Sequence, residues 1–235
     1  MSRFSTVTKT FNKVTHVIFD LDGLLLDTES IYTEATNNVV RQFGKQFTWD
    51  IKCQIMGLTG EEAAKQIVKL LDLPITWEEY YRLAHEQYRL LMPHAKFMSG
   101  AKDLVKHLHK SQIPIAVATS STEDSANLKT AKYKDIFSLF NHIVTGGSDP
   151  EVKNGKPSPE IFLVCASRFP DLPLPEKCLV FEDAPNGVTA AISAGMQCVM
   201  VPDSHIPTSK TTHATLVLKS LEDLKLEAFG LPPLH

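Results

Sequence analysis

The stretch VIFDLDG at residues 17–23 joins an apolar run to two aspartates. The β-branched and aromatic residues 17–19 have the character of a buried strand, and Asp20 and Asp22 follow it at once. A buried carboxylate is costly unless a partner compensates its charge. Either the Asp-Gly pair is an acidic turn, or the two carboxylates hold a ligand at the end of the strand.

The composition is that of an ordinary globular protein. Of the 235 residues, 43% are hydrophobic and 22% are charged, which allows one large domain or a domain that carries an insertion. The formal net charge of −3 gives no general attraction to nucleic acid or to an anionic membrane, and no apolar stretch is long enough to span a bilayer. We therefore expect neither kind of partner. An anionic ligand would have to be bound by a few local cations.

The cysteines and the N-terminus bear on the compartment. The four cysteines contain no C-x-x-C pair, and two of them lie in apolar runs, as buried reduced thiols do. Residues 1–15 contain no acid and weakly resemble an organellar transit peptide. We expect instead a frayed N-terminus ahead of the first strand, in a protein of the reducing cytoplasm.

Short runs of apolar, β-branched residues recur along the chain and predict strands. Their nearly continuous apolar character is typical of strands that are covered on both faces in a parallel sheet. The runs are 16–19, 113–118, 142–145, 178–181, 198–201 and 215–218. Helix-like stretches at 125–137, 159–169 and 184–196 separate the later runs. The alternation predicts an α/β fold, a doubly wound (Rossmann-like) parallel sheet.

A long stretch without any strand signal follows the first strand. From Glu29 to Met92 the apolar residues recur at helical spacing. We therefore predict an all-α cap domain at residues 30–94, inserted into a core domain made of residues 1–29 and 95–235. Ligands of such sheets bind beyond the carboxyl ends of the strands, where an inserted cap would lie.

Polar residues follow four of the predicted strands. Each group alone is weak, because Asp-Gly is a common turn, Thr-Ser a common helix cap and a lysine before proline usually a solvated charge. In a parallel sheet, however, all of them would meet at one edge. The groups are Asp20 and Asp22, then Thr119, Ser120 and Ser121, then Lys156, and finally Glu182 and Asp183.

Together these groups predict a chemistry. Four carboxylates at one edge would repel one another, and a hard divalent cation with oxygen ligands relieves that repulsion. Mg²⁺ suits such a set better than zinc, and it usually shares its coordination with a substrate phosphate. Lys156 and the hydroxyl of Thr119 could hold the remaining phosphoryl oxygens. Phosphoryl transfer is the reaction that this arrangement favours.

Four motifs resemble those of the haloacid dehalogenase-like superfamily, in the same order and at typical spacing. They are FDLDG (19–23), VATSS (117–121), GKPSP (155–159) and FEDAPNG (181–187), and the long insert resembles the helical C1 cap of that superfamily. The resemblance implies a Mg²⁺-dependent phosphatase that acts on a small phosphomonoester, specifically a nucleotide-like monophosphate. We expect it to work as a monomer.

The resemblance also assigns chemical roles. Asp20 would be the nucleophile that forms an aspartyl-phosphate, and Asp22 the general acid and base. The Thr119 hydroxyl and the Ser120 backbone N–H would bind the phosphoryl group. Lys156 would bind it too and would balance the charge on Asp20.

The same resemblance implies the metal ligands. They would be the Asp20 carboxylate, the Asp22 main-chain carbonyl and the Asp183 carboxylate. Glu182 would support these ligands from behind, although direct ligation stays open.

Four alternatives compete with this assignment. Dehalogenases of the superfamily lack the second aspartate and the metal, so Asp22 argues against them. A β-phosphoglucomutase-like enzyme shares every core motif, but it has an Arg in the cap loop that corresponds to residues 56–63 and a His after the nucleophile. Gly60 and Tyr32 stand at those positions here. A sugar-phosphate phosphatase stays open, whereas a non-enzymatic binding module would not be expected to keep every core residue.

Overall fold

The computed structural model describes residues 11–55, 58 and 60–234. The contacts divide the chain into two compact units, each described by itself here. The first comprises Met1–Leu26, Phe97–Asn127 and Tyr133–His235, and the second comprises Asp27–Lys96 and Leu128–Lys132. The predicted boundaries of the core and cap domains stay a prediction. Among the described helices, none is both long and apolar enough to cross a membrane.

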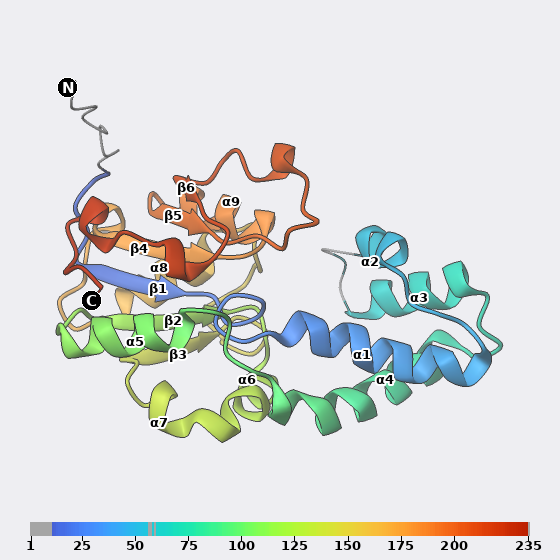
Figure 1. The fold of residues 1–235 in the computed structure, drawn as a ribbon. Coiled ribbons are helices and arrows are strands. Elements are labelled where there is room, and N and C mark those ends of the chain that lie inside the picture. Colours follow the sequence, from blue (N-terminus) through green and yellow to red (C-terminus); the bar gives the residue numbers. More distant parts are fainter. Residues whose placement is uncertain (1–10, 56–57, 59, 235) are drawn as a thin grey trace. The chain divides into compact units, whose positions relative to one another are not determined.

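The first unit contains a six-stranded parallel sheet in the order β3-β2-β1-β4-β5-β6 (Figure 1). The strands are β1 (His16–Phe19), β2 (Ile115–Thr119), β3 (His142–Thr145), β4 (Cys178–Glu182), β5 (Gln197–Met200) and β6 (Leu216–Val217). The strand order reverses at β1, with β2 and β3 on one side of it and β4, β5 and β6 on the other, as in a doubly wound sheet. The predicted α/β parallel-sheet fold is confirmed.

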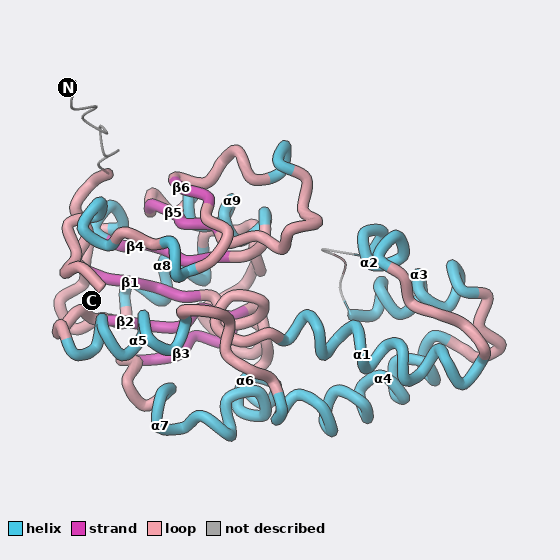
Figure 2. The backbone as a smooth tube through the Cα atoms, viewed as in Figure 1, coloured by secondary structure: helices cyan, strands magenta, loops and turns pink. Residues whose placement is uncertain are grey.

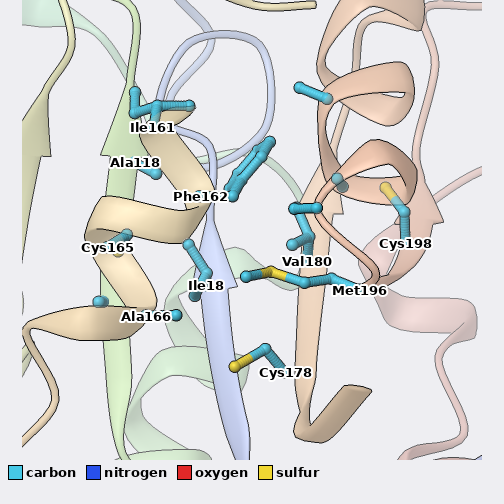
Figure 3. Close-up of a cluster of buried hydrophobic side chains, with 14 of the residues drawn as sticks. Ile18, Ala118, Ile161, Phe162, Cys165, Ala166, Cys178, Val180, Met196 and Cys198 are labelled. Atoms are coloured by element: carbon cyan, nitrogen blue, oxygen red, sulfur yellow. The ribbon is translucent and has the colours of Figure 1, made fainter. Parts of the chain in front are cut away.

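Helices alternate with the strands from β2 onward (Figure 2). The α-helices of this part are α5 (Ala101–Lys110), α6 (Glu123–Thr130), α7 (Lys134–Phe137), α8 (Glu160–Ser167) and α9 (Pro185–Ser193). Helices α8 and α9 cover one face of the sheet, where Ile18, Ala118 and Val180 pack against Phe162 and other buried side chains (Figure 3). The sheet buries both faces, which explains why the strands read as continuous apolar runs.

The helix-like stretch predicted at 125–137 is helical in the structure, but it is interrupted. In the structure α6 ends at Thr130, a short 3₁₀ turn follows, and α7 begins at Lys134. The two parts of the stretch have different surroundings: Leu128–Lys132 groups with the second unit, whereas Phe137 stacks on Phe97 with ring centroids 6.1 Å apart. Tertiary packing here overrides a continuous helical pattern.

The second unit is helical, as predicted. Its α-helices are α1 (Thr28–Val40), α2 (Trp49–Ile55), α3 (Gly60–Leu71) and α4 (Trp77–Leu91). Asp27 begins α1 as its N-cap and accepts a hydrogen bond from the Ser30 N–H, and Thr76 caps α4 in the same way. A core of its own holds the unit together, with Phe47 and Tyr80 among its buried side chains.

Candidate active site

The sheet register brings Asp20 and Glu182 together. Ile18 on β1 lies opposite Val180 on β4, and each carboxylate follows two residues later on the same face of the sheet. Both side chains are buried: Asp20 is 6% exposed and Glu182 is 1% exposed. Two acidic side chains therefore lie next to each other at the carboxyl edge, on the face that α8 covers.

Lys156 connects these two carboxylates. Its Nζ lies 2.5 Å from Asp20 Oδ1 and 2.6 Å from Glu182 Oε1, and it also donates to the Ala118 carbonyl at 3.1 Å. The ammonium group lies 5.0 Å from the centroid of the Phe162 ring. Burial alone would lower the pKa of Lys156, but the two carboxylates outweigh it and hold the pKa above its ordinary value. Lys156 is therefore a fixed cation.

A single lysine does not neutralise this cluster. Burial raises the pKa of Asp20 to about 7; Lys156 opposes the shift, while Glu182 and Asp22 add to it. Burial is the main cause of this shift, so the charge balance has to be counted from the groups themselves. The carboxylates of Asp20, Asp22, Glu182 and Asp183 lie close together and are met by the one ammonium group of Lys156. A further positive charge would therefore be bound favourably here.

Two hydroxyl groups orient Asp22. Its Oδ2 accepts hydrogen bonds from Ser121 Oγ at 2.9 Å and from Thr119 Oγ1 at 3.2 Å. The Thr119 oxygen in turn accepts the Ser121 backbone N–H at 3.1 Å, which leaves its own proton free to donate. The sequence placed Thr119 at this edge but assigned no role to Ser121. Its position within VATSS was the available signal.

Glu182 is held from a second side as well. Its Oε2 accepts the backbone N–H groups of Asp183 and Ala184 at 3.0 and 3.1 Å. Gly187 in α9 leaves room for this carboxylate, because a Cβ at that position would lie 1.8 Å from Glu182 Oε1. The role of Gly187 was missed from the sequence, although the residue closes the motif FEDAPNG.

Three carboxylates lie close enough to hold a metal ion. Ligand oxygens of Asp20, Glu182 and Asp183 all lie within 4.8 Å of one another. The set contains oxygen alone, which fits a hard cation such as Mg²⁺ and does not fit zinc, which prefers nitrogen and sulfur ligands. The residues present therefore suit the predicted metal.

In the second unit, the residues that distinguish a mutase from a phosphatase are only partly described. Met56, Gly57 and Thr59 of the predicted substrate loop lie outside the described residues. The Tyr32 ring packs edge-on against the ring of Tyr88. The Nζ atom of Lys129 lies 5.5 Å from the centroid of the Tyr32 ring. Lys129 is 1% exposed, and no motif or spacing in the sequence singles it out.

Residues 17–201 match the family described as haloacid dehalogenase-like hydrolase. This segment contains the whole cluster around Asp20, Lys156 and Glu182. The chain belongs to that family, and the resemblance inferred from the four motifs is confirmed.

Among the relatives, several carry phosphatase names. The chain is 54% identical over 224 residues to "Probable pseudouridine-5′-phosphatase" of Drosophila melanogaster, covering 95% of this chain and 97% of the relative. It is 44% identical over 236 residues to "(DL)-glycerol-3-phosphatase 2" of Arabidopsis thaliana, covering 99% and 98%. The predicted enzyme class, a phosphatase of this family, is confirmed.

The fold matches solved structures as well. A β-phosphoglucomutase from Clostridium difficile superimposes with a TM-score of 0.68 at 26% identity, covering 91% of this chain and 94% of that protein. The likeness extends over both the sheet and the helical insert, and it is consistent with a common architecture for enzymes of different names.

Proposed function

We propose that the protein is a Mg²⁺-dependent phosphatase that hydrolyses a small phosphomonoester through an aspartyl-phosphate on Asp20. The observation that carries the proposal is the cluster at the carboxyl edge of the sheet, where Lys156 Nζ lies 2.5 Å from Asp20 Oδ1 in a site with excess negative charge. Nucleophile, cation and carboxylates are thus fixed before a substrate arrives, which is how phosphoryl transfer is accelerated.

The reaction has two half-steps. An oxygen of the Asp20 carboxylate attacks phosphorus, the bond between phosphorus and the ester oxygen breaks, and Asp22 gives its proton to the leaving alcohol. Asp22 then takes a proton from a water molecule, whose oxygen attacks the same phosphorus. The bond between phosphorus and the Asp20 oxygen breaks, which releases inorganic phosphate and restores the free Asp20 carboxylate.

The neighbouring residues bind the transferred group. Lys156 offsets the negative charge of Asp20 and of the phosphoryl oxygens, and its fixed protonation supports this role. The hydroxyl of Thr119 and the backbone N–H of Ser120 supply further donors. In the structure the Thr119 hydroxyl donates to Asp22, so we propose that it is shared between the acid and the phosphoryl group.

Mg²⁺ would be held by the carboxylates of Asp20 and Asp183 and by the main-chain carbonyl of Asp22. The ion would neutralise charge on the phosphoryl oxygens and on Asp20. Glu182 lies within reach of the same ion, but each of its oxygens already accepts hydrogen bonds. We therefore propose that Glu182 holds Lys156 and the loop at Asp183 in place.

The substrate we propose is pseudouridine 5′-phosphate. The supporting observation is the 54% identity, over nearly the full length of both chains, to the Drosophila protein of that name. Glycerol 3-phosphate is the second candidate, because a relative matched over 99% of this chain is named a glycerol-3-phosphatase. A glucose phosphate would be expected if the chain instead acted as the mutase that it resembles in fold.

A substrate panel tests the proposal. Phosphate release from pseudouridine 5′-phosphate, uridine 5′-phosphate, glycerol 3-phosphate and small sugar phosphates is measured with Mg²⁺ and with a chelator. We expect the highest kcat/KM for pseudouridine 5′-phosphate and no turnover with the chelator. Equal values across the panel would reject the substrate. Activity that survives chelation would reject the metal, and isomerisation of a glucose phosphate would establish the mutase.

We also propose a monomer in the reducing cytoplasm. The four cysteines are free thiols, and three of them are buried, which suits a reducing compartment. Light scattering at the assay concentration tests the monomer. Fractionation of cells that express a tagged full-length chain tests the compartment, and recovery in an organelle would contradict it.

A further inference from the structure

The segment that leads into Lys156 has little packing of its own. Lys153, Asn154 and Gly155 are exposed, and a Cβ added at Gly155 would meet no heavy atom within 4 Å. Yet the Lys156 side chain that follows is only 7% exposed and places its ammonium group between two carboxylates. Val152 is the last residue before it that packs into the core, so the three exposed residues between Val152 and Lys156 need a further anchor.

The carboxylate of Glu160 fills this role. Its Oε2 accepts the successive backbone N–H groups of Lys153 at 2.7 Å and Asn154 at 2.8 Å, and its Oε1 accepts Asn154 Nδ2 at 2.5 Å. Two successive N–H groups that converge on one oxygen form an anion-binding nest. The side-chain bond from Asn154 is the largest of several hydrogen bonds that hold the pKa of Glu160 below its ordinary value.

Glu160 belongs to the helix that also packs beneath Lys156. Glu160 is the first residue of α8, and the same helix supplies the buried Phe162, whose ring lies below the Lys156 ammonium. One helix therefore fixes both the backbone ahead of Lys156 and the surface on which its ammonium group lies. The three bonds lie at the surface, where each contributes little energy, but together they define the course of the turn at residues 153–154.

We propose that Glu160 is a positioning residue for the phosphatase reaction: through Lys153 and Asn154 it sets the place of the Lys156 ammonium group. This inference rests on the proposed function of Lys156. Glu160 touches no reacting atom itself and acts only through Lys156. Lys156 also binds the substrate phosphate, but catalysis depends on contacts that are stronger in the transition state than in the ground state, so a displaced ammonium group should lower kcat more than it raises KM.

Two variants separate position from charge. Glu160→Ala removes all three bonds, and we expect kcat to fall ten- to a hundredfold with KM changed less than about threefold, since a misplacement of about 1 Å can cost that much. In Glu160→Gln, the amide oxygen still accepts the two backbone N–H groups, and Asn154 can turn its amide to accept from the new NH₂ group. We expect this variant to keep kcat within about threefold.

A second readout follows the position of Lys156 directly. The folded protein of each variant is treated briefly with an acylating reagent and is then digested. The modification of Lys156 is measured by mass spectrometry of the resulting peptides. We expect modification of Lys156 to rise at least fivefold in Glu160→Ala and to stay at the wild-type level in Glu160→Gln. Glu78→Ala, at an exposed glutamate in the first turn of α4, is the matched control.

The outcomes keep the two proposals apart. Wild-type protein without phosphatase activity would overturn the proposed function, whereas the labelling would still report on Glu160. Active wild-type protein with unchanged kcat and unchanged labelling in Glu160→Ala would overturn the positioning role alone. Equal loss of kcat in the Ala and Gln variants would also overturn it. If Glu160→Ala does not fold, Asn154→Ala removes one of the three bonds and should give a smaller change in the same direction.

Discussion

Replacing Gly187 by alanine should disturb the site through the carboxylate of Glu182, which lies against this glycine. The added Cβ would lie 1.8 Å from Glu182 Oε1, 1.9 Å from its Cδ and 2.4 Å from its Oε2. These atoms are the end of a flexible side chain, so rotation of Glu182 could relieve the overlap. That rotation, however, takes the carboxylate away from Lys156 and from two backbone N–H groups.

The expected loss of unfolding free energy follows from the burial of the pair formed by Glu182 and Lys156. Breaking one partner out of a buried ion pair costs about 3–5 kcal/mol, and forcing an extra methyl group into a packed core costs about 1–3 kcal/mol. The Glu182 and Lys156 side chains are 1% and 7% exposed, so the pair is buried. Because the chain takes the cheaper route or a mixture of the two, we expect Gly187→Ala to lose about 3 kcal/mol of unfolding free energy.

Urea unfolding, followed by circular dichroism, measures this loss. Gly155→Ala is the matched control, since its Cβ would meet nothing within 4 Å, and it should stay within about 0.5 kcal/mol of wild type. The variant at Gly187 should also lose phosphatase activity in the fraction that remains folded. A stability for Gly187→Ala equal to that of the Gly155 control would refute the reasoning.

Two further predictions concern side chains around the site. Hydrogen bonds from Arg168 lower the pKa of Asp149, so their stabilisation is present above the ordinary pKa of an aspartate and is lost as the pH falls below it. Arg168→Met should therefore cost up to about 1 kcal/mol at pH 7 and less at pH 3 in urea unfolding, and a pH-independent cost would contradict this. Ser121→Ala removes a donor to Asp22 and should lower kcat about tenfold with little change in KM. Ser120→Ala keeps the backbone N–H, so it should not lower kcat. Equal losses of kcat in the two variants, measured by steady-state kinetics, would contradict the role of Ser121 as a donor to Asp22.

The sequence predicted the sheet because its strands are buried on both faces. A run such as residues 178–181 shows no polar alternation, which leaves few places for it other than the middle of a parallel sheet. The convergence of Asp20, Lys156 and Glu182 followed from that topology alone, since parallel strands end at one edge. Charge and topology together therefore predict that these three groups lie together, and the structure places them within hydrogen-bond distance of one another through Lys156.

What the sequence could not predict are contacts that depend on side-chain direction. Ser121 lies within VATSS and Glu160 directly follows GKPSP, but only the folded backbone shows that Ser121 donates to Asp22 and that Glu160 accepts from the turn at Asn154. Gly187 resembled any small residue in a helix until the position of the Glu182 carboxylate was known. The 3₁₀ turn that follows Thr130 likewise shows no signal in the local pattern of apolar residues.

The central claim is that Asp20 carries the phosphoryl group during turnover. Wild-type protein is mixed with Mg²⁺ and a ³²P-labelled phosphomonoester, quenched in acid within the first turnover, and digested for peptide analysis. We predict label on the peptide that contains Asp20, and neither label nor phosphate release in a folded Asp20→Asn variant. Label on another residue, or sustained turnover by Asp20→Asn, would contradict the account.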